Sequence, residues 1–171
     1  MNLTIIITAS FNPTHPNINY IQTVIESLNY LSIDSSNKIN VLLCHDDLNP
    51  SKHFENEKKY QDNLQIYEEY FKKISKYLEN YNKTSTKFVL TIIKNNKWGH
   101  LTGNIRHAIK FVNTKYLLVL QHDMSFCKNI NISSIIKDMK DNPQLKHIQF
   151  HRNNDVETGW FKDKYNFLNN N

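Results

Sequence analysis

Residues 3–8 read LTIIIT and residues 39–44 read INVLLC, so the chain holds two unbroken runs of mainly apolar and β-branched residues. A strand that is buried on both faces, as in a parallel sheet, has this pattern. Between the two runs, apolar residues at helical spacing predict a helix over about 17–31. Strand, helix and strand in this order predict a βαβ unit with a right-handed crossover.

The alternation of strands and helices continues along the chain. Apolar residues in alternating steps of four and three predict a long amphipathic helix over about 54–81. The further predicted elements are a strand at 87–94, a loop at 97–103, a helix at 104–112 with Ile105, Ala108, Ile109 and Val112 facing inward, a strand at 116–120, a helix at 130–139 and a strand at 147–151. This series predicts an α/β fold with a mostly parallel central sheet and helices on both faces.

Three of the predicted strands end in polar residues that could carry chemistry. The clusters are Ser10 to Asn12, His45 to Asp47, and Gln121 to Asp123. In open α/β sheets, ligands bind at the carboxyl ends of the strands. We therefore expect the three clusters to lie at one edge of the sheet and to form one cleft.

Asp123 directly follows a buried strand, where a carboxylate is well placed to hold a hard cation. Mg²⁺ or Mn²⁺ would use it together with diphosphate oxygens, and the metal would offset the charge that builds up on a leaving diphosphate. His151, at the end of the last predicted strand, is a candidate further ligand. The alternative role of Asp123 is to cap the turn or the next segment.

Asp46 and Asp47 follow the second strand, where a carboxylate can accept hydrogen bonds from a ribose hydroxyl or a base N–H. The alternative is an Asp-rich turn that leads into Asn49 and Pro50. A helix opens at Gly99, His100, Gly103, Asn104 and Arg106, and its free N–H groups suit an anion, to which Arg106 or His100 could add charge. The alternative is an ordinary helix start with a surface arginine.

Composition and charge narrow the class of partner. The 171 residues are 39% hydrophobic, which is enough for a packed core, and the net charge is +5. The basic residues are scattered and only two of them are arginine, so we expect a solvated surface and no nucleic-acid partner. Cys44 and Cys127 form no disulfide framework, and no signal peptide or transmembrane segment is visible. The expected location is cytoplasmic.

Taken together, the clusters resemble those of GT-A type glycosyltransferases, in particular family 2 and similar enzymes found in viruses and microbes. The matching segments are Thr8-Ala9-Ser10-Phe11-Asn12, His45-Asp46-Asp47, residues 98–106 (WGHLTGNIR), and Leu120-Gln121-His122-Asp123, and the resemblance covers about residues 3–152. It departs from the family pattern at Gln121, which replaces the first aspartate of the metal-binding Asp-x-Asp motif.

The resemblance implies a GT-A (nucleotide-diphospho-sugar transferase) fold and transfer of a sugar from a UDP- or GDP-sugar to the hydroxyl of a glycan or another acceptor, with Mn²⁺ or Mg²⁺ as cofactor. Asp123 and His151 would be the metal ligands. The residues that would bind the nucleotide sugar are Thr8, Ala9, Ser10, Phe11, Asp46, Asp47, Gly103, Asn104, Arg106, Gln121 and His122.

By the same resemblance, residues 1–171 form a single GT-A-like domain. Residues 1–125 would be the donor-binding half, and residues 126–171 would be the start of an incomplete acceptor half. Such enzymes use an Asp or Glu base in the acceptor half. Asp155 and Glu157 lie in that region, and the catalytic base is not assigned to either.

Two other functions fit parts of the sequence. Residues 10–15 (SFNPTH) resemble the first motif of adenylyl- and cytidylyltransferases, in which a second histidine follows three residues after the first. Here that position is Ile18, and residues 132–134 (ISS) resemble a later segment of those enzymes. The other alternative is a non-catalytic module that binds a nucleotide or a sugar.

Overall fold

A computed structural model of the chain describes residues 2–48 and 57–150. The chain divides into two compact units, Met1–Ser133 and Ser134–Asn171. The first unit carries the central sheet and every cluster discussed below. Helix α5, Ile132–Asp141, begins at the end of the first unit and supplies the described secondary structure of the second.

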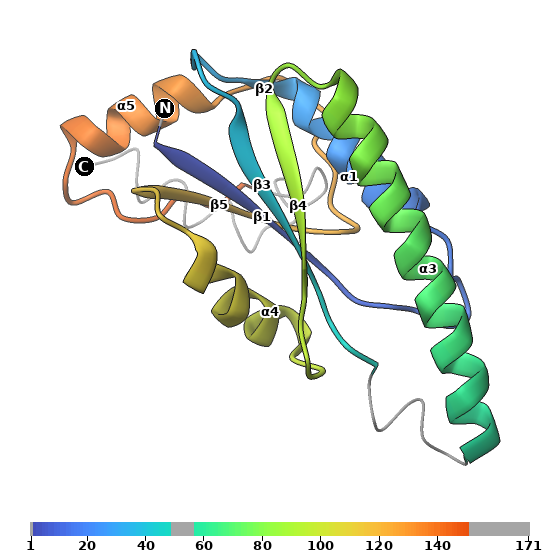
Figure 1. The fold of residues 1–171 in the computed structure, drawn as a ribbon. Coiled ribbons are helices and arrows are strands. Elements are labelled where there is room, and N and C mark those ends of the chain that lie inside the picture. The colour runs from blue at the N-terminus through green and yellow to red at the C-terminus, as the bar shows by residue number, and fades with distance from the viewer. Residues whose placement is uncertain (1, 49–56, 151–171) are drawn as a thin grey trace, which may run out of the picture. The chain divides into compact units, whose positions relative to one another are not determined.

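The first unit is a four-stranded parallel sheet with helices between its strands (Figure 1). Its strand order is β4-β3-β1-β5, and a separate pair of two-residue strands, β2 and β6, is also parallel. In chain order the elements are β1 Leu3–Ala9, α1 Asn19–Ser27, the 3₁₀ turn η1 Leu28–Tyr30, β2 Leu31–Ser32, β3 Ile39–His45, α3 Glu57–Thr84, β4 Phe88–Lys94, α4 His100–Ala108, the 3₁₀ turn η2 Ile109–Phe111, β5 Tyr116–Gln121 and β6 Ile130–Asn131.

The strand order determines which helix covers which face. From β1 the chain steps outward to β3 and then to β4, and it next returns across the sheet to β5 on the other side of β1. Since crossovers between parallel strands are right-handed as a rule, the helices before and after this reversal are expected on opposite faces. Figure 1 shows α1 and α3 on one side of the sheet and α4 on the other. The strand order therefore reverses between β1 and β5.

The predicted parallel sheet is confirmed, and burial explains why the sequence indicated it. All seven residues of β1 are buried, since helices pack on both faces of this strand. On the α4 face, Ile6, Leu42, Cys44 and Ile93 pack together with Ala108. The stripe predicted along residues 54–81 also faces the sheet, where Tyr67, Ile74 and Leu78 are buried; residues 54–56 lie outside the described residues.

Helix α4 corrects the predicted loop over residues 97–103, because it begins at His100 rather than at Asn104. Two glycines in this segment lower its intrinsic helix propensity, and tertiary hydrogen bonds override that preference. The helix also tightens into η2 at Ile109, where the change to three residues per turn alters the direction of the side chain. Ile109 is 50% exposed, so the prediction that it faces inward was wrong.

Other predictions near the end of the described chain also need correction. Residues 147–150 form no strand, and His151, the last residue of that predicted strand, lies outside the described residues. Strand β5 is not buried on both faces, since Leu117 and Val119 are each 37% exposed. Among the helices of residues 2–48 and 57–150, none has the length and apolar character needed to cross a membrane.

Candidate functional site

Hydrogen bonds beyond the strand ends bring the three predicted clusters to one edge of the sheet. The N–H of Asp46 donates to the carbonyl of Ala9 at 3.0 Å, and the N–H of His122 donates to the carbonyl of Thr8 at 2.9 Å. On the other side of β3, the N–H of Asn95 donates to the carbonyl of His45 at 2.8 Å. The expectation that the clusters converge at the carboxyl edge is therefore confirmed.

Asp46 is the centre of a buried hydrogen-bond network at this edge. One carboxylate oxygen accepts a hydrogen bond from Ser10 Oγ at 2.6 Å, and the other accepts one from the N–H of Gly99 at 2.9 Å. Asp46 is fully buried, whereas Asp47 is half-buried and accepts a hydrogen bond from the N–H of Leu48 at 2.9 Å. Asp46 thus joins the loop after β1 to the start of α4, and Asp47 is the more accessible carboxylate of the pair.

Asn104 fixes α4 against the ends of β1 and β3. Its Nδ2 donates to the carbonyl of Ala9 at 3.1 Å, and its Oδ1 accepts a hydrogen bond from Asn95 Nδ2 at 3.0 Å. Cys44 Sγ donates to the same oxygen at 3.7 Å. Burial, together with the nearby Asp46 carboxylate, raises the pKa of Cys44 to about 11, so the sulfur keeps its proton. The Asn104 amide is therefore engaged inside the protein.

His45 lies in an aromatic cluster under the edge. Burial lowers the pKa of His45 to about 4, so the ring is neutral at physiological pH. Its Nδ1–H donates to the carbonyl of Asp46 at 2.8 Å, which leaves Nε2 to accept the Tyr70 hydroxyl at 3.3 Å. The Tyr67 hydroxyl donates to the same Asp46 carbonyl at 2.7 Å. The ring of Phe11 packs on Tyr67 and Tyr70, with centroids 5.3 Å apart in both pairs.

The predicted site residues differ in how accessible they are. Thr8 and Ala9 are buried in β1, and Thr8 Oγ1 donates to the carbonyl of Leu120 at 3.2 Å. Phe11, Asp46 and Asn104 are also buried. The half-buried residues are Ser10, Asp47, Gly103, Gln121 and His122, and the exposed ones are Arg106 and Asp123.

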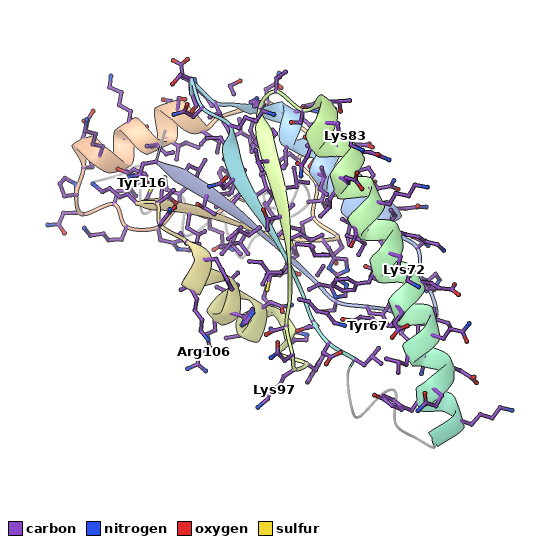
Figure 2. The ribbon with its side chains drawn as sticks, in the orientation of Figure 1. Tyr67, Lys72, Lys83, Lys97, Arg106 and Tyr116 are labelled. Atoms are coloured by element: carbon purple, nitrogen blue, oxygen red, sulfur yellow. The ribbon has the colours of Figure 1, made fainter. Side chains whose placement is uncertain are left out.

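Arg106 is set apart from the strand-end clusters. It belongs to the last turn of α4, and its side chain extends away from the ribbon (Figure 2). At the other end of this helix, His100 has a φ of 54°, in the left-handed region that costs energy for a residue with a side chain. Such strain is found where the surrounding structure fixes the backbone. Here the Asp46–Gly99 hydrogen bond fixes the preceding residue.

The predicted Mn²⁺ or Mg²⁺ cofactor stays a prediction. Asp123 offers one exposed carboxylate directly after β5, which is the type of ligand that Mg²⁺ and Mn²⁺ prefer. Within residues 2–48 and 57–150, no group of three or more His, Cys, Asp and Glu side chains is placed to hold a metal ion. A cation at Asp123 would therefore need ligand oxygens and water, in keeping with how Mg²⁺ binds beside diphosphates.

A pocket of about 280 Å³ opens beside the loop that follows β1. Ser10 and His122 contribute to its lining, so it lies where the strand order reverses between β1 and β5. Ligand sites in α/β sheets favour this position. The full lining is Ser10, Asn12, His15, Asn17, Tyr20, Ile21, Tyr70 and His122.

Sequence patterns missed half of this lining and singled out the other half, namely Ser10, Asn12, His15 and His122. Apolar residues spaced alternately by four and three predicted the buried face of α3. Tyr70 is not one of them, yet it is buried. Asn17 and Tyr20 carry no motif. The signal that could have found Asn17 was the polar character of residues 12–17 at the end of a buried strand.

The two glycines of the α4 segment give a matched test of this geometry. A Cβ on Gly99 would lie 2.9 Å from Gly103 Cα, whereas a Cβ on Gly103 would meet no atom within 4 Å. We expect Gly99→Ala to lower the free energy of unfolding by about 2 kcal/mol, because the backbone that Asp46 holds must shift. Gly103→Ala should raise it by up to about 1 kcal/mol, since a helical glycine is replaced without a clash. Urea unfolding of both variants tests this, and a lower stability of Gly103→Ala than of Gly99→Ala would contradict the described packing.

Comparison of the chain with known protein families, with curated proteins and with solved structures found no match. The fold and site define an α/β protein with a parallel sheet, a polar carboxyl edge and a pocket where the strand order reverses.

Proposed function

We propose that this chain binds a nucleotide diphosphate sugar at the carboxyl edge of its sheet and acts as a GT-A type glycosyltransferase. The observation that carries the proposal is the pair of accessible carboxylates on either side of β1. Asp47 follows β3 and Asp123 follows β5, and both strands pair with β1. The edge thus offers one acid for a nucleoside and another for a cation at a diphosphate.

Asp47 and Asp46 have different parts in this proposal. The accessible Asp47 carboxylate would accept a hydrogen bond from a ribose hydroxyl or a base N–H. The buried Asp46 is a positioning residue, because it holds Ser10 and Gly99 in place through both of its carboxylate oxygens. Preorganisation of this kind lowers the entropy that a site loses when a ligand binds.

Asp123 would hold Mn²⁺ or Mg²⁺ against the diphosphate. The bound cation would supply neutralisation of the charge that develops on the leaving nucleoside diphosphate. In the transfer, the hydroxyl oxygen of a glycan or another acceptor forms a bond to the anomeric carbon as the bond to the diphosphate oxygen breaks. The hydroxyl proton passes to a general base, which we do not assign to any described residue.

Titration calorimetry of the full chain with UDP, GDP, CDP and ATP, each with and without Mn²⁺, tests the donor site. We expect UDP or GDP to bind in a Mn²⁺-dependent way and Asp123→Ala to weaken that binding by at least about tenfold, or about 1.4 kcal/mol. Asp34→Ala is the matched control, because Asp34 is exposed and lies ahead of β3, at the amino edge of the sheet. Binding that is independent of metal and of Asp123 would contradict the proposal.

Nucleotidyl transfer is the second candidate, and His15 is the residue that favours it because it lines the pocket. The Ile-Ser-Ser segment argues against it. Ser133 Oγ accepts a hydrogen bond from the N–H of Asp34 at 2.7 Å, and Asp34 precedes β3. Ser133 therefore lies at the amino edge of the sheet, opposite the edge at which His15 lies. Binding of ATP or CTP that is lost in His15→Ala and kept in Asp123→Ala would favour this candidate.

A non-catalytic module differs from both enzymes in turnover. Its ligand would bind with the same dependence on Asp47 or Asp123, and no donor would be consumed. Measuring release of nucleoside diphosphate from the donor that binds, with and without an added glycan acceptor, separates binding from transfer.

A further inference from the structure

We propose that the pocket between the loop after β1 and the start of α1 binds a pyranose ring of the acceptor, so that the acceptor is a sugar rather than another hydroxyl compound. This inference rests on the proposed function, which defines the acceptor. It assigns Ser10 and His122 to the acceptor sugar, whereas the family resemblance assigned them to the nucleotide sugar. The pocket holds about 280 Å³, near the lower end of the range for ligand sites. A space of this size suits one ring rather than a whole nucleotide sugar.

The lining has no fixed charge. None of the eight described residues that form it is Lys, Arg, Asp or Glu. A diphosphate would need cationic side chains or a carboxylate-held metal to offset its charge, and neither Asp47 nor the proposed metal ligand Asp123 lines this pocket. The donor sugar is attached to that diphosphate, whereas an acceptor sugar is neutral. The chemistry of the lining therefore favours the acceptor.

Hydrogen bonds within the loop after β1 determine which polar atoms of Asn12 and His15 are left for a ligand of the pocket. The hydroxyl of Thr14 donates its hydrogen to Asn12 Oδ1 at 2.8 Å. Because the hydroxyl has no second hydrogen, Thr14 Oγ1 is the acceptor in its 2.9 Å contact with His15 Nδ1. His15 Nδ1 therefore carries the hydrogen of this contact, and Nε2 is the ring nitrogen left for a ligand. The N–H of Thr14 also donates to Asn12 Oδ1, at 3.1 Å, which directs the Asn12 NH₂ group away from these contacts.

Asn17 adds a second amide donor of the same kind. Its Oδ1 accepts the N–H of Asn19 at 3.2 Å, and its NH₂ group has no partner among the described residues. Together with His15 and Asn12, it gives the lining both donors and acceptors. Sugar hydroxyls both donate and accept, so a mixed set of donors and acceptors matches them.

Tyr20 supplies the apolar side of the pocket. It lies in the first turn of α1 with 59% of its surface exposed, so its ring is free to pack against a ligand. The ring of Tyr70 is already covered by Phe11 and His45. A nucleobase often stacks between two aromatic rings, and this pocket offers one accessible ring. A pyranose needs one aromatic face for its C–H groups and polar partners for its hydroxyls.

The test is amide NMR of the full chain with a panel of methyl glycopyranosides, with the matching nucleotide sugars, and with UDP, GDP and pyrophosphate. We expect at least one methyl glycoside to shift the amide signals of residues 10–17 and His122. Tyr20→Ala should weaken that binding about tenfold, which corresponds to about 1.4 kcal/mol. Tyr20→Phe keeps the ring and should bind as the wild type does. Tyr30→Ala is the control, because Tyr30 is 45% exposed and does not line the pocket.

Three outcomes would overturn the inference. One is that no methyl glycoside shifts these signals at millimolar concentration. Another is that they shift only with a nucleotide sugar, which would make the pocket a donor site. The third is that UDP, GDP or pyrophosphate alone shifts them. Failure of the proposed donor site would give a different result. A methyl glycoside would then bind in the pocket, but no nucleotide would bind in a Mn²⁺-dependent way.

Discussion

Asp46→Ala is expected to lower the free energy of unfolding by about 3–5 kcal/mol. The substitution removes a fully buried carboxylate and leaves the Ser10 hydroxyl and the Gly99 N–H without their acceptor. Hydrogen bonds to a charged group contribute about 1.5–3 kcal/mol each, and buried groups left unpaired add a desolvation cost. Because the bonds join segments 36 and 53 residues away from Asp46, we also expect weaker ligand binding at the edge. Urea unfolding measures the stability change.

Asp47→Ala is the matched control for this experiment. The neighbouring carboxylate is half-buried, and its described hydrogen bond is to the N–H of Leu48. We expect a loss of stability of no more than about 1 kcal/mol, together with reduced nucleotide binding if Asp47 contacts the nucleoside. Asp46→Asn should lie between the two, since it keeps one acceptor oxygen. Equal stability of the two alanine variants would show that the network around Asp46 contributes little.

The protein is expected to lose about 3 kcal/mol of stability as the pH falls from about 6.5 to about 4, because of His45 alone. Burial lowers the pKa of His45 from 6.5 to about 4 in the folded state. Between these values the unfolded chain binds a proton that the folded chain does not, so acid favours unfolding. Each pKa unit corresponds to about 1.36 kcal/mol, and folding lowers the pKa of His45 from 6.5 to about 4. Denaturant unfolding at a series of pH values measures the slope.

His45→Gln separates this effect from the titration of carboxylates. Glutamine does not titrate, so the variant should be less stable than the wild type at pH 7 and should lose less stability on acidification. The stability difference between the two proteins should therefore shrink as the pH falls from 6.5 to 4. A difference that stays constant across this range would show that His45 does not titrate as its burial requires.

The positions of the strand-end clusters could be predicted because they depend on a local pattern. A buried parallel strand is an apolar run, and the residues that follow it emerge at the carboxyl edge whatever the rest of the chain does. Ser10, Asp47 and Asp123 were found in this way. The separate roles of Asp46 and Asp47 could not be predicted, since neighbouring aspartates differ only in which long-range partners they meet.

The start of α4 shows the opposite case. Its glycines favoured a loop, and the helix begins earlier because the N–H of Gly99 donates to Asp46 and the Asn104 amide donates to the carbonyl of Ala9. The strands β2 and β6 have two residues each, too few to show any periodicity, and they exist through pairing with each other. Long-range hydrogen bonds of this kind leave no signature in a single segment.

The sequence by itself determined the α/β class, the parallel strands of the sheet and the edge at which its polar residues gather, because hydrophobic periodicity is a local property of the chain. Only the tertiary structure decided that Asp46 is buried, that α4 begins at His100, and that Tyr20, Tyr70 and His15 line one pocket. The physical reason is that burial and hydrogen-bond partners depend on which distant segments meet. The order of the strands and the packing of the helices on the sheet determine which segments meet.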